Sequence, residues 1–499
     1  MDLANKEMIA FFEALQRDHL AVTFDDVRLK TGEFCGDSLS DISLETLFSR
    51  NVPLRIPIVS AAMDTVTEHK LAIEMARFGG LGIIHKNLSP EKQAHEVGRV
   101  KHFIHGFVEK PICVAPDQTV EAVLGMKREK GYGFDTFPVL DGYGKLVGIL
   151  TGNDFDFEDR GSLVSKAMTK EVVTAPRGTT VDQAYDLLRE HKKKVLPILG
   201  DDGLLIGLYT LSDITRIKSG TSAYNLDAKG QLRVGAAIGV LGDAYERVEQ
   251  LINENVDVVV IDTAHADSKN VYETLKELKR KYGSLDVVVG NVSEAPSARR
   301  LLDAGADGIK VGQGGGSICT TRIIAGIGCP QVSAVYQCAK DVSVPICSDG
   351  GIRYSGDVTI ALGAGAHSVM LGNALAGTEE TPGQIVLVDG RQWKMYRGMG
   401  SLSAMQEHAG SRARYKLGSG GTLIPEGVEG LVPYRGNVGD VLTQFVGGLR
   451  SGMGSVGALT IDELHSKAIF HRISSAGQTE SHPHDIKITQ EAPNYRGKQ

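Results

Sequence analysis

The stretch DVVVIDTA, residues 257–264, decides the fold, because its run of β-branched side chains ends abruptly in the polar pair Asp262 and Thr263. Seven further short apolar runs, each followed by a helical stretch, read IPIVSAAM from residue 56, LGIIH from 81, VGAAIG from 234, VVVGN from 287, GIKVG from 308, VPICSDG from 344 and SVMLGN from 368. Apolar strands that alternate with helices indicate a parallel sheet covered on both faces, and eight strands close a barrel. The sequence therefore predicts an α/β fold, a (β/α)8 TIM barrel, with a doubly wound open sheet as the alternative.

A direct repeat interrupts the strand series between residues 106 and 218. One copy begins with APDQTV at residue 115 and the other with APRGTTV at residue 175, and each continues through an amphipathic helix and two strands to Thr-x-x-Asp. The repeat resembles the tandem CBS (Bateman) pair, a regulatory module that commonly binds adenine or guanine nucleotides. We therefore predict a catalytic barrel from residues 1–105 and 219–499, with the CBS pair inserted at 106–218.

The Thr-x-x-Asp motifs are the candidate ligand residues of this insert. The resemblance places Thr151 with Asp154, and Thr210 with Asp213, near the phosphate and ribose of a bound nucleotide. The alternative is that the two aspartates only cap the helices that follow them.

Composition excludes several classes of protein. The 499 residues exceed one ordinary domain, and a net charge of −7 with mixed signs disfavours a nucleic-acid binder, which needs a basic patch. The six cysteines include no CxxC pair, which predicts reduced thiols in the cytoplasm. No apolar run approaches the ~20 residues of a membrane span, and the charged N-terminus is a poor signal peptide.

Reactive side chains cluster where the predicted strands end, as in the active sites of barrel enzymes. The loop GQGGGSICTTR, residues 312–322, is the sharpest signal. Its glycines let backbone N–H groups approach an anion, and Cys319 follows on the same loop as a candidate nucleophile. The alternative for this loop is a flexible turn with a buried cysteine. That second interpretation is the one we expect for four other thiols, Cys113, Cys329, Cys338 and Cys347.

Two aspartates at other strand ends are candidates for binding ribose. Asp349, in the DGG after the seventh strand, could accept hydrogen bonds from two ribose hydroxyls, and Asp262 could serve a second ribose of a dinucleotide. No GxGxxG follows an early strand, so any nicotinamide cofactor lies across the barrel mouth. Residues 396–436 are polar and glycine-rich with little periodicity, which is typical of a lid or of disorder.

These residues resemble the IMP dehydrogenase family over essentially the whole chain. The motifs that carry the resemblance are VSAAMDTVTE from residue 59, GGLGIIHKN from 79, GADGIKVG and GGGSICTTR from 305 to 322, DGGI from 349, LGNALAGTEE from 371, YRGMGSL from 396, RY at 414–415 and PEGVEG from 425.

The resemblance implies a two-step reaction. Cys319 adds to C2 of the hypoxanthine of IMP, hydride leaves to NAD, and a covalent thioimidate forms on the enzyme. A mobile flap near residues 401–430 then replaces the departed NADH, and Arg414, with Tyr415 and Thr321, activates the water that releases XMP. An arginine as base is chemically unusual, because guanidinium holds its proton far above neutral pH.

The resemblance also assigns binding roles by position. It implies phosphate contacts from Ser317, Gly351, Gly372, Asn373 and Tyr396, a ribose contact from Asp349, base contacts from Gly398, Met399, Gly400 and Glu426, and cofactor contacts from Asp262, Thr263, Gly312 and Gly314. A K⁺ site is implied by the carbonyls of Gly314, Gly316 and Cys319, completed by Glu480, Ser481 and His482 of a neighbouring subunit; carbonyl ligands suit this weakly hydrated ion. The family is tetrameric, with octamers in some members.

Some residues depart from the family pattern, and two rival functions stay open. Gln313 and Gly315 stand where the family usually has Ile or Met and then Pro or Ser, which puts the cation dependence in question. GMP reductase shares the barrel and the cysteine loop but needs no Arg-Tyr dyad, so Arg414 and Tyr415 favour the dehydrogenase. The other rival is a non-catalytic purine nucleotide sensor.

Overall fold

The structure is a computed structural model that describes residues 3–104, 107–108, 111–157, 159–218, 222–242, 244–408, 411 and 423–495. The chain divides into two compact units. The larger unit contains Met1–Lys101 and Ala223–Gln499, and the smaller unit is His102–Ser222.

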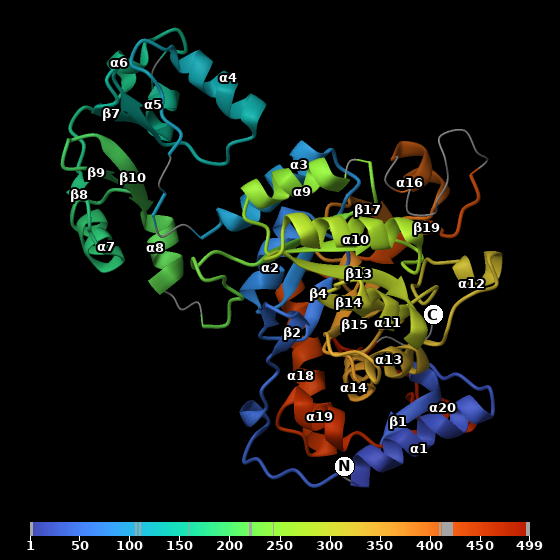
Figure 1. Ribbon diagram of the computed structural model, residues 1–499. Coiled ribbons are helices and arrows are strands. Elements are labelled where there is room, and N and C mark those ends of the chain that lie inside the picture. Colours follow the sequence, from blue (N-terminus) through green and yellow to red (C-terminus); the bar gives the residue numbers. More distant parts are fainter. Residues whose placement is uncertain are drawn as a thin grey trace. The chain divides into compact units, whose positions relative to one another are not determined.

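Eight parallel strands of the larger unit form a closed barrel, which confirms the predicted fold class (Figure 1). In chain order they are β4 (Ile58–Ser60), β5 (Leu81–Ile84), β11 (Val234–Ile238), β12 (Val258–Asp262), β13 (Asp286–Val292), β14 (Gly308–Val311), β15 (Ile346–Asp349) and β16 (Ser368–Leu371). Every predicted strand run contributes one of them. Pairing of β16 with β4 closes the ring, so the open-sheet alternative is wrong.

Helices cover the outside of this barrel, as a parallel sheet buried on both faces requires. They are α2 (His69–Arg77), α3 (Pro90–Lys101), α9 (Ala244–Asn253), α10 (Lys269–Lys281), α11 (Ala295–Asp303), α13 (Gln331–Ala339), α14 (Ser355–Gly363) and α18 (Val438–Val456). Short elements around them are α1 (Leu3–Arg17), β1 (Val27–Leu29), α12 (Thr321–Ile324), α15 (Asn373–Ala376), α19 (Ile461–Lys467), β20 (Phe470–Arg472) and α20 (Ser475–Glu480).

The barrel interior is packed with β-branched side chains and closed at its amino end. Val258, Val260 and Val288 point into one buried apolar cluster. The hairpin of β2 (Thr46–Ser49) and β3 (Val52–Leu54) adds Phe48 to the same cluster, and Ser49 donates to the buried Asp286 carboxylate at 2.6 Å. Among the described residues, this hairpin covers the amino end of the barrel, so a ligand is expected at the carboxyl ends of the strands.

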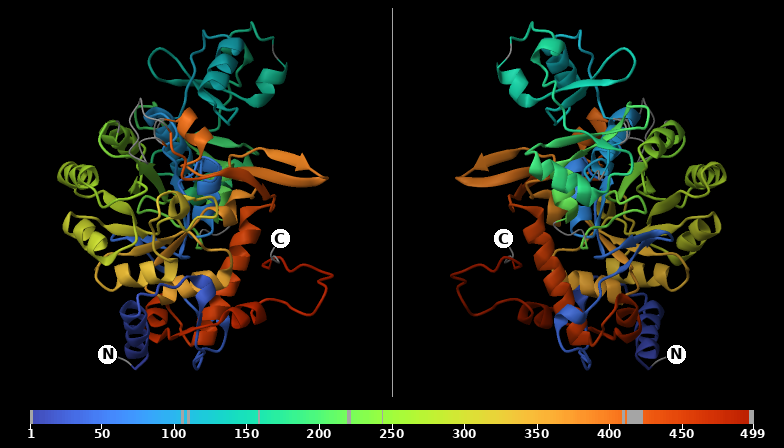
Figure 2. Two further views of the ribbon diagram at one scale, coloured as in Figure 1. Left: turned by 90° about the vertical axis from the view of Figure 1, so that its right-hand side faces the viewer. Right: turned by 90° about the vertical axis from the view of Figure 1, so that its left-hand side faces the viewer.

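A three-stranded sheet extends the barrel near its open end. It consists of β17 (Ile385–Val388), β18 (Arg391–Arg397) and β19 (Glu429–Pro433). Figure 2 shows the β17–β18 hairpin standing away from the barrel. The helix α16 (Leu402–Glu407) follows β18, so β18 delivers the segment 398–400 to the barrel mouth.

Each half of the smaller unit contains a helix, two antiparallel strands and a second helix, with one more short helix in the first half and a short parallel strand in the second. The elements are α4 (Val120–Lys130), β6 (Phe137–Leu140), β7 (Leu146–Leu150), α5 (Gly152–Phe157) and α6 (Val164–Ala167), then β8 (Ala175–Pro176), α7 (Val181–Glu190), β9 (Val195–Leu199), β10 (Leu205–Thr210) and α8 (Leu211–Lys218). Asp154 accepts from the Thr151 backbone at 2.7 Å, and Asp213 accepts from the Thr210 hydroxyl at 2.6 Å. Both aspartates thus stabilise a helix start, and nucleotide binding by this unit stays a prediction.

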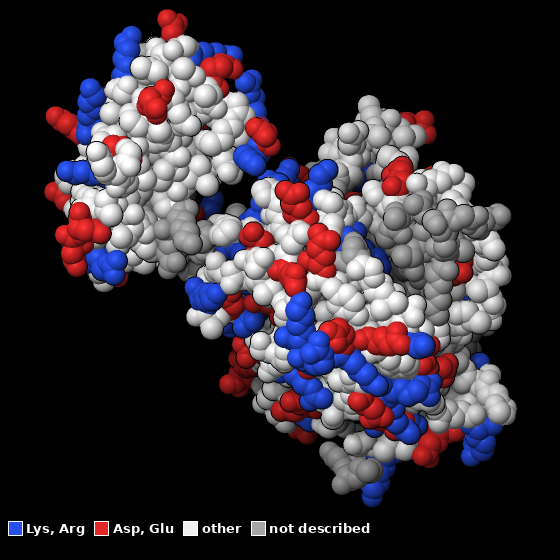
Figure 3. All heavy atoms as spheres, turned by 45° about the horizontal axis from the view of Figure 1, so that its top comes forward, with Lys and Arg blue, Asp and Glu red and all other residues white. Residues whose placement is uncertain are grey.

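Two surface properties bear on possible partners. On the face shown in Figure 3, acidic and basic side chains are interspersed over each unit. Among the described residues, no helix combines the length and apolar character that crossing a bilayer demands.

Candidate active site

A cavity of about 420 Å³ opens at the carboxyl ends of the barrel strands. Its volume falls within the range of small-ligand sites. Sixteen of the predicted site residues line it: Asp262, Gly312, Gly314, Gly316, Ser317, Cys319, Thr321, Asp349, Gly351, Gly372, Asn373, Tyr396, Gly398, Met399, Gly400 and Glu426. Residues spread over some 165 positions of the sequence therefore line one cavity, because parallel strands direct the loops that follow them to the same end of a barrel.

The glycine loop after β14 is held against the loop after β15 at van der Waals distance. Gly312 has φ +146°, and a Cβ on it would lie 2.0 Å from the Asp349 carbonyl oxygen. Gly314 also has a positive φ, and Arg322 donates from Nε to the Gln313 carbonyl at 3.0 Å. Gly312 is therefore required by the close approach of the two loops. The predicted approach of the loop's backbone N–H groups to an anion stays a prediction.

Gln313, one of the departures from the family pattern, lines the cavity and belongs to a hydrogen-bond network. Its amide donates to the Ala264 carbonyl at 3.2 Å and accepts from the Ser293 hydroxyl at 2.7 Å. The side chain is 7% exposed. Gln313 thus ties the glycine loop to the loops after β12 and β13.

Cys319 lies in the cavity wall beside a polar pair. Its Sγ donates to Thr321 Oγ1 at 3.2 Å, and that hydroxyl donates to Glu426 Oε2 at 2.7 Å. The backbone of Thr320 donates to the Glu426 carbonyl at 2.9 Å, and Cys319 pairs with Gly427 as an isolated β-bridge. The predicted nucleophile is thus half-buried in the cavity wall, next to a hydroxyl and a carboxylate that could move a proton.

Sequence analysis missed a buried lysine in the centre of the site. Lys310, on β14, is 2% exposed. Its Nζ lies 2.6 Å from Asp349 Oδ2 and 3.1 Å from Asp262 Oδ1, and it also donates to Asn291 Oδ1. A buried charge of one sign must be compensated by the other, so Lys310 holds together the two aspartates that were predicted to bind ribose. The sequence feature that could have identified Lys310 is its position as a single charged residue inside the apolar run GIKVG.

Tyr396 also lines the cavity. Burial raises the pKa of its phenol, and a hydrogen bond with Ser317 acts in the opposite direction. A Cβ on Gly372 would lie 2.9 Å from the phenol oxygen. The hydroxyls of Tyr396 and Ser317 therefore meet beside glycine backbone, which is an arrangement suited to an anionic oxygen.

Six predicted site residues lie elsewhere or outside the described part of the chain. Thr263 is buried, and its hydroxyl donates to the Gly290 carbonyl at 2.9 Å, so it does not line the cavity. Glu480 and Ser481, in and after α20, are exposed, while His482 contacts the Tyr495 hydroxyl at 3.0 Å; a neighbouring subunit was predicted to supply these three. Arg414 and Tyr415 lie outside the described residues.

Exposure separates Cys319 from three of the other thiols. Burial raises the pKa of Cys329 to about 11 and that of Cys347 to about 12, and it raises the pKa of Cys338 further. Because the thiolate is the reactive form, iodoacetamide at neutral pH is expected to alkylate Cys319 and the exposed Cys35 at least about tenfold faster than these three. Peptide mass mapping over time measures the rates. Alkylation of Cys347 as fast as Cys319 would contradict this assignment.

The chain is similar to known proteins over nearly its whole length. The IMP dehydrogenase / GMP reductase domain family matches residues 21–484. The chain is 49% identical over 483 residues to an inosine-5'-monophosphate dehydrogenase from Halalkalibacterium halodurans (95% of this chain, 98% of the relative), and 49% identical over 481 residues to the one from Aquifex aeolicus (95% and 97%). A solved GMP reductase from Trypanosoma brucei, a cysteine-to-alanine variant in complex with guanosine 5'-monophosphate, superposes with a TM-score of 0.85 at 38% identity, covering 94% of this chain and 98% of that one. The chain belongs to the IMP dehydrogenase / GMP reductase family.

Proposed function

We propose that this protein is an enzyme that oxidises IMP to XMP with NAD⁺ in guanine nucleotide synthesis. The observation that supports this most is Cys319, which stands in a nucleotide-sized cavity and is hydrogen-bonded to Thr321. The dehydrogenase relatives share 49% of their residues with this chain, against 38% for the reductase structure. Identity over nearly the whole length thus favours the dehydrogenase over the reductase.

The first step is addition of the Cys319 thiolate to C2 of the hypoxanthine. The thiol loses its proton to solvent in the open cavity before the nucleotide binds, and Thr321 Oγ1, which lies 3.2 Å from Sγ and donates to the Glu426 carboxylate, orients the sulfur. The new C–S bond makes C2 tetrahedral, and hydride then departs from that carbon, leaving the C2=N3 bond of a covalent thioimidate. In this scheme Ser317, Tyr396 and the glycine backbones hold the phosphate, and Asp349 holds the ribose.

The residues at the barrel mouth fit a nicotinamide dinucleotide. Asp262 lines the cavity with its carboxylate oriented by Lys310, so it can accept a hydrogen bond from a ribose hydroxyl. When bound, NAD⁺ accepts the hydride that C2 releases. Thr263 is turned away from the cavity, so Asp262, Gly312 and Gly314 are the residues we assign to this cofactor.

The second step is hydrolysis of the thioimidate. Water adds to C2, its proton passes to the protein, and the C–S bond breaks to return the Cys319 thiol and XMP. We assign water activation to Arg414 with Tyr415, as the resemblance implies. The hydrogen-bonded chain from Thr321 to Glu426 is a second acceptor for the same proton, because a carboxylate 2.7 Å from the hydroxyl can take it in one transfer.

Glu426→Gln is therefore expected to slow hydrolysis while leaving hydride transfer largely intact. The glutamine amide keeps the hydrogen bond to Thr321 but cannot accept a proton. Because a general base of this kind accelerates its step, we expect the steady-state rate to fall about tenfold or more. Stopped-flow NADH absorbance should show a burst of one equivalent followed by the slower rate. Equal slowing of burst and steady state would assign Glu426 to binding the base instead.

Three finer features are part of the proposal. The carbonyls of Gly314, Gly316 and Cys319 hold K⁺, with Glu480, Ser481 and His482 of a second subunit; Gly316 O already accepts the Cys319 N–H at 3.1 Å and keeps a lone pair for an ion. The chain forms a tetramer, to which the exposed side chains of Ile385, Leu387 and Met395 contribute. The smaller unit binds an adenine or guanine nucleotide. The K⁺ site is tested by comparing the rate of turnover in K⁺ with the rate in N-methylglucamine. Light scattering measures the oligomeric state, and titration of the whole chain with adenine and guanine nucleotides measures binding by the smaller unit.

One substrate comparison separates the candidate functions. IMP with NAD⁺ should produce NADH absorbance at 340 nm and XMP by chromatography. Turnover of GMP with NADPH in its place would establish the reductase, and nucleotide binding with neither turnover would establish the sensor.

A further inference from the structure

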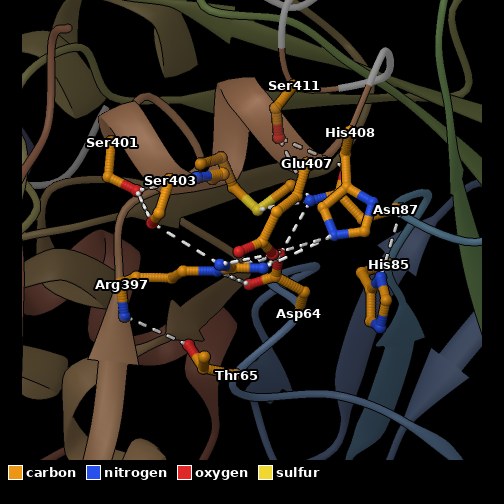
Figure 4. Close-up of polar contacts among 12 residues, drawn as sticks. Asp64, Thr65, His85, Asn87, Arg397, Ser401, Ser403, Glu407, His408 and Ser411 are labelled. Carbon is orange, nitrogen blue, oxygen red and sulfur yellow. Dashed lines mark hydrogen bonds and ion pairs between the residues drawn. The ribbon is translucent and has the colours of Figure 1, made fainter.

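Three loops of the barrel mouth meet in a polar cluster that none of the assigned roles includes (Figure 4). Its centre is Arg397, the last residue of β18. Asp64 comes from the loop after β4, and Asn87 comes from the loop after β5. We call Asp64, Asn87 and Arg397 the anchor. None of the three lines the 420 Å³ cavity.

The ion pair of the anchor is buried and bonded through several atoms. Arg397 donates from Nη2 to Asp64 Oδ2 at 2.9 Å and from Nε to Asp64 Oδ1 at 3.2 Å, with side-chain exposures of 16% and 7%. Burial acts to raise the pKa of Asp64, but the hydrogen bonds from Arg397 and Asn87 outweigh it, and the pKa lies below its usual value. A forked pair of this kind fixes direction as well as distance.

Asn87 extends the anchor to the residue that faces the base. Its amide donates to Asp64 Oδ2 at 2.8 Å, and it lies 3.9 Å from Met399 Sδ. The same amide donates to the Ser411 hydroxyl at 3.1 Å, and both Asn87 and Ser411 are buried. On the outer side, Arg397 Nη1 pairs with Glu407 at 2.8 Å, which fastens α16.

The segment 398–400 is thereby held from both sides. At one side, Arg397 and Asn87 fix its start and its methionine. At the other, Gly398 donates to the Val428 carbonyl at 3.0 Å and the Gly400 carbonyl accepts from Glu426 N at 3.0 Å. Gly398, Met399 and Gly400 are buried and line the cavity, so a shift of the anchor would displace the cavity wall at the base.

We propose that Asp64 is a positioning residue for the purine base: through Arg397 and Asn87 it sets the position of Met399 and of the 398–400 backbone, and it has no part in holding ribose or phosphate. This proposal rests on the proposed function in one respect, namely that the base faces Met399. The ribose contact and the other phosphate contacts lie on the loops after β14, β15 and β16, which the anchor does not touch. Tyr396 precedes Arg397 on β18, where its backbone pairs with Gly430 of β19.

The test compares ligands with and without a base. Asp64→Ala is expected to weaken IMP binding about tenfold or more, because a buried guanidinium loses its partner charge. Binding of ribose 5-phosphate, measured by competition in the same calorimeter, should stay within about twofold of the parent protein. Asp64→Asn keeps the side-chain volume and serves as a second variant in case the alanine variant misfolds. It should also weaken the binding of IMP but not of ribose 5-phosphate, by a smaller factor than Asp64→Ala.

Asp307 provides a matched control. Its side chain is 8% exposed and pairs with Lys279 at 2.7 Å before β14, at the opposite end of the barrel. Asp307→Asn should change IMP and ribose 5-phosphate binding equally or leave both unchanged. Equal weakening of the two ligands in both Asp64 variants, or no weakening of IMP, would overturn the proposal. Because only binding is measured, a failure of the proposed oxidation leaves this comparison intact.

Discussion

Cys319→Ala is expected to abolish NADH formation from IMP, with a loss of at least about 10³-fold in turnover, since no bond to C2 can form without the sulfur. Nucleotide binding should survive, because the contacts to phosphate and ribose come from other residues of the cavity. Absorbance at 340 nm measures turnover, and calorimetry measures the affinity for IMP.

The covalent step has its own readout. The Cys319 thiolate should displace chloride from a 6-chloropurine nucleotide, which adds the mass of the nucleotide less HCl to the peptide that contains Cys319 and not to the peptide that contains the exposed Cys35. Cys35→Ala serves as the matched control and should retain full turnover. Retention of more than about a tenth of the activity by Cys319→Ala would remove covalent catalysis from the mechanism.

Gly312→Ala is the second substitution with a large expected effect. The new methyl group would lie 2.0 Å from the Asp349 carbonyl, and the φ of +146° disfavours any side chain. The two loops must therefore separate, at a cost of about 3 kcal/mol or more in stability. Because Asp349 and Cys319 lie on those two loops, IMP binding should also fall.

Gly315→Ala, in the same loop, isolates the cause. A Cβ at Gly315 has no neighbour closer than 3.6 Å and its φ is not positive, so its stability should change by less than about 1 kcal/mol. Urea unfolding monitored by circular dichroism compares the two variants. If the Gly312→Ala protein is as stable as the Gly315→Ala protein, the loops after β14 and β15 accommodate the added methyl group and the prediction is wrong.

The fold was predictable because its signal is local. Each strand run is short, β-branched and followed by a helix, and eight such units have one common closed arrangement. The cavity followed in the same way, since residues at strand ends must share one end of the barrel. Thr263 is the exception among the strand-end residues: it lies next to Asp262, but its hydroxyl satisfies the Gly290 carbonyl instead of facing the cavity.

Long-range partners were beyond the reach of the sequence. Lys310 resembles an ordinary interruption of an apolar run until β12 and β15 bring Asp262 and Asp349 to it. Asp64 and Arg397 are 333 residues apart, and the sequence around either residue does not indicate that the two form a pair. Hydrophobic periodicity and loop glycines report on the chain near themselves, whereas the pairing of buried charges depends on which loops the closed barrel brings face to face.

The sequence by itself determined the barrel, the inserted repeat and the cysteine loop, because these follow from patterns within a few dozen residues. Tertiary structure alone decided which side chains neutralise Lys310, which acceptor lies next to Thr321, and what holds the 398–400 segment in place. The physical reason is that burying a charge is favourable only beside its partner, and only the folded chain selects that partner.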